Sequence, residues 1–206
     1  MTAGKRALDI GLGLLLCVVL ALPMVIIAAL ILIRDGRPVF YPSTRMKDPT
    51  TPFTLWKFRT MAPRAADHTV SAGYKNKAIT RTGHVLRRTR LDELPQLFNI
   101  LRGDISFVGP RPPLPRYVTL CPEIYTEVLR NRPGVTGLAT LRFHRREEQL
   151  LARCHDAAET DHVYRQRCIP TKAKLDLIWA RNHSLCFDLR LIVETAKRVF
   201  SIGPQR

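Results

Sequence analysis

The chain has 206 residues, enough for one folded domain and a membrane element. Its 33 lysines and arginines exceed its 17 aspartates and glutamates, and the net charge of +16 favours partners that carry phosphate: nucleic acid, an anionic bilayer surface or phosphorylated substrates. The five cysteines are odd in number and widely spaced, which argues against a disulfide framework and for a reducing compartment.

An uncharged, apolar segment runs from residue 10 to residue 33. With a rise of about 1.5 Å per residue, a helix of this length crosses a hydrocarbon core of about 30 Å. The segment is too long for a cleaved signal peptide, and a buried helix of a soluble protein fits poorly because every face is apolar. We therefore predict that it inserts into a membrane.

The flanks and the centre of this segment leave two modes of insertion open. Pro23 removes a backbone hydrogen bond near the middle of the helix. Basic residues flank both ends, Lys5 and Arg6 before the segment and Arg34 and Arg37 after it, whereas a spanning helix should have an asymmetric distribution of positive charge. A re-entrant helix that breaks near Pro23 and returns to the same face accounts for both flanks. A spanning helix with a proline kink is the alternative.

The remainder of the chain is polar and basic, and its patterns predict short elements. The last predicted helix carries one apolar stripe, for which core packing is the commoner role and contact with the bilayer interface the alternative. This stripe consists of Leu189, Ile192, Val193, Ala196 and Val199. We expect strands at residues 39–41 and 53–58, an irregular loop at 62–78, and helices at 84–89, 94–101, 123–131, 145–158, 172–182 and 188–200.

The densest candidate for chemistry lies in residues 80–113, where Asp92 and Glu93 are adjacent acids. Pro95 is tolerated in a helix only in the first turn, so we expect a helix that begins near Asp92, with its positive end keeping a carboxylate ionised. A carboxylate among phosphate-binding arginines can hold Mg²⁺ or attack phosphorus, whereas an isolated Asp-Glu pair is more often a helix cap or a solvated charge pair. The surrounding arginines are Arg81, Arg87, Arg88, Arg90, Arg102 and Arg111.

Several motifs in this region and beyond it resemble those of the bacterial sugar transferase family, the monotopic phosphoglycosyl transferases. The similarity runs in order from about residue 4 to the C-terminus. Two short stretches, residues 43–47 and 137–140, depart from the family pattern, which bears on the preference for sugar or nucleotide. The matching motifs are LDELPQL at 91–97, GD at 103–104, VGPRP at 108–112, KFRTM at 57–61 and RPGVTGL at 132–138.

This resemblance implies a two-step transfer that starts glycan or exopolysaccharide assembly. Asp92 would attack the β-phosphorus of a UDP-sugar and release UMP, and a polyprenyl (undecaprenyl) phosphate would then accept the sugar phosphate from the aspartate. Glu93 would bind Mg²⁺. The residues expected to bind substrate phosphate are Lys57, Arg59, Arg87 and Arg111.

The resemblance also implies an α+β, mainly helical fold with little β-structure. Residues 1–36 would form a re-entrant membrane helix with flanking basic residues, broken at Pro23. Residues 37–206 would form a cytosolic catalytic domain that includes interfacial helices. The expected location is the cytoplasmic face of the bacterial inner membrane, where anionic lipids are further partners, and a homo-oligomer is compatible with this arrangement.

Other function classes have less support. His144, Cys154, His155, His162 and Cys168 lack the paired spacing of a structural zinc site. Glu147 and Glu148 are expected on a solvated helix face. We expect no nucleic-acid partner, because no recognisable motif is present and few aromatic residues lie among the basic ones. A non-catalytic basic membrane adaptor, or a membrane protein that binds nucleic acid, is the alternative class, and such a protein would keep its binding function when Asp92 is replaced.

Overall fold

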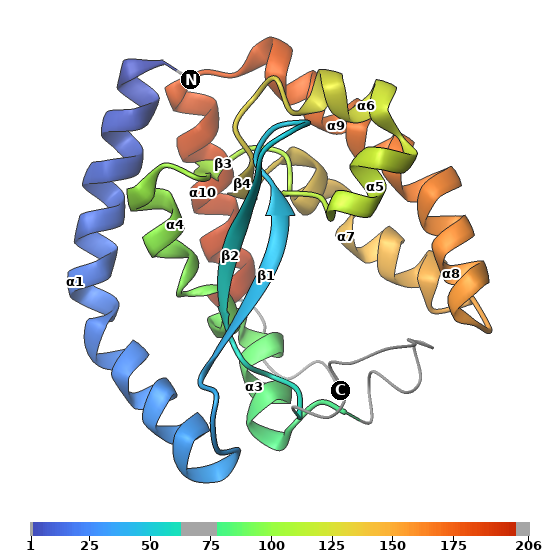
Figure 1. Cartoon of the computed structure of the whole chain (residues 1–206). Helices are drawn as coiled ribbons and strands as arrows, with labels where there is room; N and C mark the ends of the chain where they lie inside the picture. The colour runs from blue at the N-terminus through green and yellow to red at the C-terminus, as the bar shows by residue number, and fades with distance from the viewer. Residues whose placement is uncertain (1, 63–77, 201–206) are drawn as a thin grey trace.

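The computed structural model describes residues 2–62 and 78–200, so the predicted loop at 62–78 lies almost wholly outside the described residues. Within these residues the chain is mostly helical, with two small two-stranded sheets between the helices (Figure 1). The prediction of a mainly helical α+β fold is confirmed.

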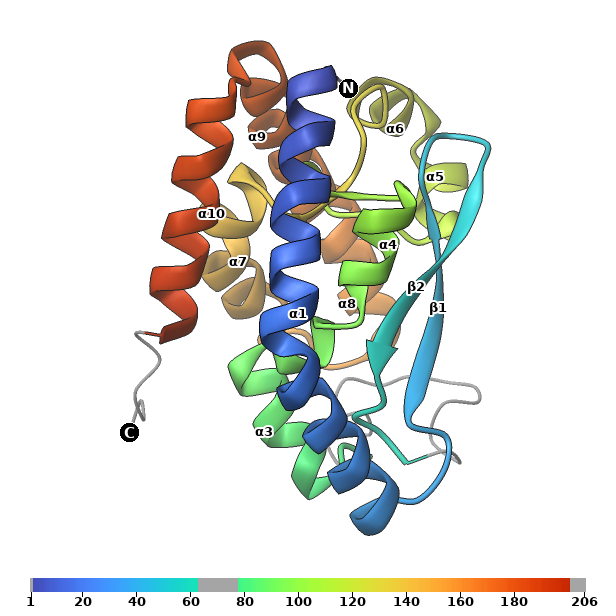
Figure 2. The same cartoon turned by 90° about the vertical axis from the view of Figure 1, so that its left-hand side faces the viewer.

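The first element, α1 (Ala3–Arg34), is a 32-residue helix that is long and apolar enough to cross a membrane. The Thr2 side chain caps it by accepting a hydrogen bond from the backbone of Lys5. Pro23 lies inside the helix, and the helix continues on both sides of it. An interruption of the helix at Pro23 is therefore not found. The helix axis instead bends in its second half (Figure 2), as expected where a proline removes one backbone bond.

A hairpin and two helices follow α1, and the two helices lie against it. The strands β1 and β2 are antiparallel, in a register that runs from Phe40 opposite Phe58 to Met46 opposite Pro52. The first strand is longer than the apolar pattern predicted, because backbone pairing with β2 continues through a polar stretch. The elements of this half are β1 (Phe40–Met46), β2 (Pro52–Phe58), α3 (Arg81–Thr89) and α4 (Gln96–Arg102).

The second half of the chain is a group of helices around a short parallel sheet, in which Ser106 of β3 lies opposite Gly134 of β4. The helix predicted at 145–158 is wrong in its extent. It is two helices, the second of which begins where the Asp156 side chain accepts from the backbone of Glu159 at 2.7 Å. The elements are β3 (Ser106–Val108), α5 (Pro115–Leu120), α6 (Pro122–Val128), β4 (Gly134–Thr136), α7 (Leu138–Leu151), α8 (Ala157–Val163), α9 (Ile169–Asn182) and α10 (Leu185–Phe200).

The largest apolar cluster joins both halves, and its members come from β2, α4, β3, α7, α9 and α10. On α10 the buried apolar residue is Leu191, whereas Leu189, Val193 and Ala196 of the predicted stripe are exposed. Core packing is therefore wrong for these three, and the exposed stripe is the surface that the interfacial alternative requires. The members of the cluster are Leu55, Leu97, Ile100, Ile105, Phe107, Val108, Leu141, Trp179 and Leu191.

The first turns of α1 are attached to the body by polar side chains. Lys5 forms a buried ion pair with Asp188 of α10. Arg6 donates to two carbonyl oxygens at the end of α4, each at 2.7 Å. Asp9 accepts from the Ser106 hydroxyl at 3.0 Å. This charged end of the apolar helix is thus an integral part of the body.

Candidate active site

The two adjacent acids lie in a single 3₁₀ turn, Leu91–Glu93, between α3 and α4. Arg90 ends α3 in the left-handed conformation, with φ at 60°, and α4 begins only at Gln96, with Pro95 as its N-cap. A helical segment therefore does begin near Asp92, as predicted, but as a 3₁₀ turn, and the α-helix proper follows only from Gln96. No side chain caps this turn.

Glu93 is clamped by two cations from distant parts of the chain. Its Oε1 atom lies 2.8 Å from Nζ of Lys57 on β2, and 2.7 Å from a guanidinium nitrogen of Arg111 in the segment after β3. Burial opposes ionisation of this carboxyl, but Arg111 and Lys57 outweigh burial and hold the pKa of Glu93 well below its usual range. Glu93 is thus a fixed negative charge between two phosphate-binding candidates.

Asp92 is also buried but has no such clamp. Burial, and then the negative charge of Glu93, raise the pKa of Asp92 above its ordinary value, although nearby cations partly oppose this. We expected a helix dipole to keep this carboxylate ionised. The pKa of Asp92 is instead raised, which favours its protonated form. A desolvated carboxylate is a stronger nucleophile than a solvated one once it has lost its proton.

The other two basic residues predicted here have different positions. Nε of Arg87, on α3, donates to the Thr60 hydroxyl at 2.8 Å, and its charge is among those that act on Asp92. Arg59 is buried and donates to the carbonyl oxygens of Asp35 and Gly36 at 2.7 and 2.6 Å. These bonds use one guanidinium nitrogen and fix Arg59 against the end of α1, while its Nε and Nη1 atoms are buried without a partner among the described residues. Phosphate binding by Arg59 therefore stays a prediction.

Two close backbone approaches position this cluster, and each requires a glycine. A Cβ atom on Gly83 would lie 2.2 Å from the carbonyl oxygen of Thr60, which sets α3 and its Arg87 against the end of β2. A Cβ atom on Gly109 would lie 2.3 Å from the carbonyl oxygen of Arg132, which sets the segment of Arg111 against β4. Gly83, and Gly109 of the VGPRP motif, are thus explained by packing that positions the site residues.

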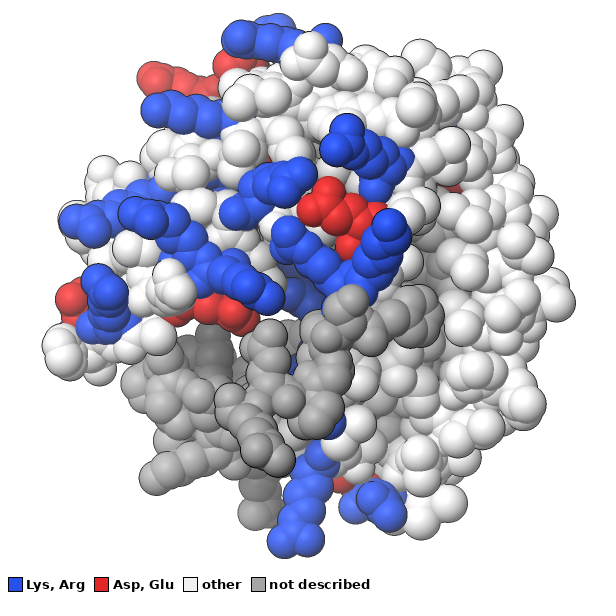
Figure 3. Space-filling model, turned by 180° about the vertical axis from the view of Figure 1, so that it is seen from behind, with Lys and Arg blue, Asp and Glu red and all other residues white. Residues whose placement is uncertain are grey.

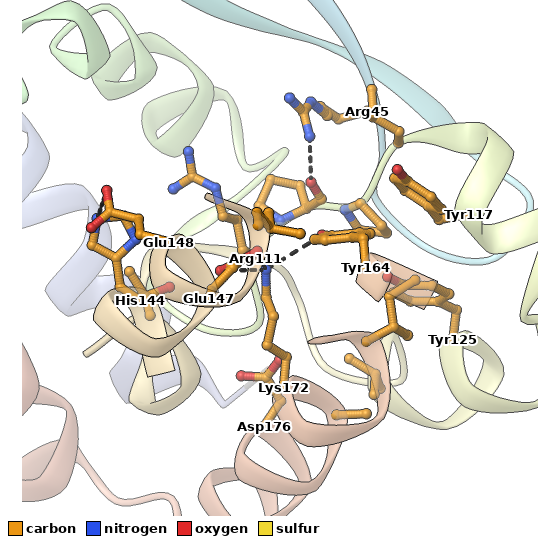
Figure 4. A pocket seen from close by; sticks show the side chains of 18 of the residues that line it. Arg45, Arg111, Tyr117, Tyr125, His144, Glu147, Glu148, Tyr164, Lys172 and Asp176 are labelled. Carbon is orange, nitrogen blue, oxygen red and sulfur yellow. Dashed lines mark hydrogen bonds and ion pairs between the residues drawn. The ribbon is translucent and has the colours of Figure 1, made fainter. Parts of the chain in front are cut away.

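A pocket of about 300 Å³ opens beside the acids, and Arg111 forms part of its wall. Figure 4 shows side chains from several separate elements that point into it. Near Arg111 the wall includes Arg45 and Arg90. The Arg90 guanidinium contacts Nε2 of His144 at 2.7 Å, and burial together with Arg90 lowers the pKa of that histidine, so the neutral ring accepts the bond.

The far side of the pocket is polar. Lys172 of α9 lies 3.0 Å from Glu147 of α7 and 3.4 Å from the hydroxyl of Tyr164. The sequence predicted a solvated helix face for Glu147 and Glu148. This is wrong for Glu147, which is half-buried, whereas Glu148 is exposed. One turn along α9 from Lys172, burial raises the pKa of Asp176 to about 7. No pattern in the sequence identified this set, because Glu147 lies on a different helix from Lys172 and Asp176.

Charged side chains are unevenly distributed over the surface of the protein. In Figure 3 lysines and arginines gather on the side away from α1, where acidic residues lie among them, and the side of α1 is nearly free of charge. Within residues 2–62 and 78–200, no three histidine, cysteine or acidic side chains lie close enough together to hold a metal ion by themselves.

Comparison with known proteins agrees with the motifs. A model of the family described as bacterial sugar transferase matches residues 1–202. An uncharacterized sugar transferase of Bacillus subtilis, EpsL, is 32% identical over 198 residues, which are 95% of this chain and 86% of that protein.

Two longer relatives have names that state a reaction. The UDP-glucose:undecaprenyl-phosphate glucose-1-phosphate transferase of Escherichia coli is 30% identical, and the match covers 95% of this chain but only 40% of that protein. An Aeromonas hydrophila protein named UDP-N-acetylgalactosamine-undecaprenyl-phosphate N-acetylgalactosaminephosphotransferase is 30% identical, with 96% and 44% covered. The chain thus spans less than half of these two relatives, yet nearly all of its own length is matched, and it belongs to the bacterial sugar transferase family.

Proposed function

We propose that this chain transfers a sugar 1-phosphate from a UDP-sugar to undecaprenyl phosphate, through a phosphosugar held covalently on Asp92. The observation that carries the proposal is the pair of unlike carboxyls: Asp92 buried without an ion pair in the described residues, next to Glu93 fixed between Lys57 and Arg111. The names of the relatives support the donor and acceptor.

In the first step an ionised Asp92 oxygen attacks the β-phosphorus. The bond between carboxylate and phosphorus forms as the bond to the UMP oxygen breaks, and UMP leaves with that electron pair. Lys57, Arg87 and Arg111 bind the phosphate oxygens, on which negative charge is concentrated. In the second step a phosphate oxygen of the polyprenyl acceptor attacks the same phosphorus and releases Asp92, so the carboxylate is regenerated.

The residues fit a Mg²⁺ that arrives with the diphosphate. The described hydrogen bonds and ion pairs of Glu93 involve Oε1, which leaves Oε2 for a cation, and Mg²⁺ in nucleotide enzymes is held by one or two carboxylates together with substrate phosphates. Glu93 would hold the ion, with Asp92 adjacent. When bound, the ion offsets the charge of the diphosphate.

The membrane arrangement we propose is re-entrant and places the body at the cytoplasmic face of the inner membrane. The exposed apolar side chains of α1, the basic residues at both of its ends and the bend in its second half support this arrangement. The acceptor phosphate would then meet the site at the membrane surface, while the UDP-sugar enters from the cytoplasm.

The test is formation of the covalent adduct. Wild-type protein in nanodiscs, incubated with UDP-sugars and Mg²⁺ but without acceptor, should gain the mass of one phosphosugar and release UMP. Asp92→Asn should gain no mass, because an amide is not a competent nucleophile towards phosphorus. Glu127→Gln, which changes an exposed carboxylate of α6, is the matched control and should keep the adduct. Undiminished adduct in Asp92→Asn would move the nucleophile to another residue.

A further inference from the structure

The pocket beside the acids is connected to them through Arg111. This guanidinium contacts Glu93 and also lines the pocket. Asp92, Glu93 and Lys57 do not line the pocket. A donor whose diphosphate is held at Arg111 can therefore have one of its two ends in the pocket, either the nucleoside or the sugar.

The polar side of the pocket offers hydrogen-bonding groups of both kinds. Lys172 donates, and its partner Glu147 accepts. Asp176 is 8% exposed and has no ion-pair partner among the described residues, although it lines the pocket. Because burial raises the pKa of Asp176 to about 7, its carboxyl is present both as donor and as acceptor near neutral pH. Such a set matches adjacent hydroxyl groups, each of which donates and accepts.

The aromatic side of the pocket does not form a slot for a flat base. The rings of Tyr117 and Tyr164 pack against each other, with centroids 4.8 Å apart and planes inclined by 44°. Stacking on a nucleobase requires a free ring face parallel to the base. Tyr125, on the same side of the pocket, is largely buried. Figure 4 shows these three rings on one side and Lys172 with Asp176 below them.

From this lining we infer that the pocket holds the sugar of the UDP-sugar, and that Glu147, Lys172 and Asp176 read its hydroxyl pattern. The inference rests on the proposed function and adds the position of the sugar and the residues that select it. A polyprenyl chain is excluded from the pocket by the same charged groups, because burying them against hydrocarbon would leave them without partners.

The test measures binding without turnover. In an Asp92→Asn background, in nanodiscs, the dissociation constants of UDP-glucose, UDP-galactose, UDP-N-acetylglucosamine, UDP-N-acetylgalactosamine and UMP are measured by calorimetry. Asp176→Asn and, on the facing helix, Glu147→Gln each remove one charged hydrogen-bond partner. Each should change the ratio of affinities between at least two of the UDP-sugars by about tenfold. UMP binding should be unchanged, since UMP lacks the sugar that is transferred. The two substitutions lie on separate helices, so the test still gives an answer if one of the variants fails to fold.

Glu127→Gln is the matched control: it removes an exposed carboxylate of α6 that does not line the pocket, and it should change no affinity. Equal weakening of UMP and of every UDP-sugar in Asp176→Asn and Glu147→Gln would place the nucleoside in the pocket and overturn the inference. Unchanged affinities would remove the donor from the pocket altogether. The adduct experiment on Asp92 is separate, because an adduct can form wherever the sugar lies; adduct formation with unchanged affinities would therefore contradict the sugar site alone.

Discussion

Asp92 and Glu93 are consecutive residues of one 3₁₀ turn, yet the protein shifts their pKa values in opposite directions. The difference arises from their partners. Glu93 contacts Lys57 and Arg111, whereas Asp92 is buried and senses the charge of Glu93. Two acids with opposite shifts suit two roles, one as a permanent charge and one as a group that gains and loses a bond to phosphorus.

The first prediction concerns pH. If Asp92 must be ionised to attack, the rate falls as pH decreases through its raised pKa. Glu93→Gln removes one of the charges that raise this pKa, so the acidic limb of the rate of UMP release should move to lower pH, while the maximal rate falls because the Mg²⁺ ligand is weakened. The measurement is kcat/KM between about pH 4 and pH 8. Glu123→Gln, on the exposed side of α6, should leave the limb in place. A shift of the acidic limb to higher pH would contradict the assignment of this limb to Asp92.

The second prediction concerns Gly83. An alanine there would place its Cβ 2.2 Å from the Thr60 carbonyl oxygen, so α3 must move and the bond from Arg87 to the Thr60 hydroxyl is lost. Because misplacement of a binding group by about 1 Å can cost about a hundredfold, UMP release should fall by tenfold or more. Gly11→Ala is the control, because a Cβ at Gly11 meets no atom within 4 Å. Equal activity of both variants would show that the position of α3 has no role in the reaction.

The third prediction concerns stability. Lys5 pairs with Asp188, and Asp188 also accepts from the indole of Trp179 at 2.9 Å. Lys5→Met leaves a buried, unpaired carboxylate, which should lower the free energy of unfolding by about 3–5 kcal/mol. Thermal unfolding in detergent measures this loss. Lys174→Met, at an exposed position of α9, should have little effect. Adding Asp188→Asn to Lys5→Met should recover part of the stability, and no recovery would mean that packing of the Lys5 stem, rather than charge, accounts for the loss.

The fourth prediction concerns the path of α1. With the native cysteines replaced, a Thr2→Cys variant in intact cells should not react with a membrane-impermeant maleimide, and it should react after permeabilisation. Adding Pro23→Leu restores the missing backbone bond in a uniformly apolar segment, which favours a straight spanning helix and should allow labelling from outside. Thr50→Cys, at an exposed position of the β1–β2 turn, reports on the body. Efficient labelling of Thr2→Cys without Pro23→Leu would establish a spanning helix.

Long, uniform patterns in the sequence predicted the structure well, whereas local geometry did not. The apolar run gave α1 because its composition is unambiguous over six turns. The helix expected near Asp92 begins there only as a 3₁₀ turn. The left-handed Arg90 that separates this turn from α3 could not be predicted, because non-glycine residues rarely adopt that conformation. The bonds from Arg59 to the backbone at the end of α1 had no signal in the motif, because they join residues more than twenty positions apart in the sequence.

The motif residues of the site could be found because they are close together in the sequence or carry a family pattern. The pocket could not, because Glu147 and Lys172 meet only after α7 and α9 pack together. Neither residue type is unusual on a helix, and a glutamate in a run of charged residues is more often solvated. Their pairing depends on tertiary contact, which a single sequence does not contain.

The attachment of α1 to the body has a mechanical consequence. Lys5, Arg6 and Asp9 each bind a different element, α10, α4 and β3 respectively, so the start of the helix cannot tilt or slide without breaking all three contacts. In the membrane arrangement proposed above, these three contacts fix the height and angle of the turn that holds Asp92 relative to the bilayer. A substitute helix with the same hydropathy but without these three side chains would keep the protein on the membrane. It would no longer hold the body at a fixed depth relative to the lipid phosphates.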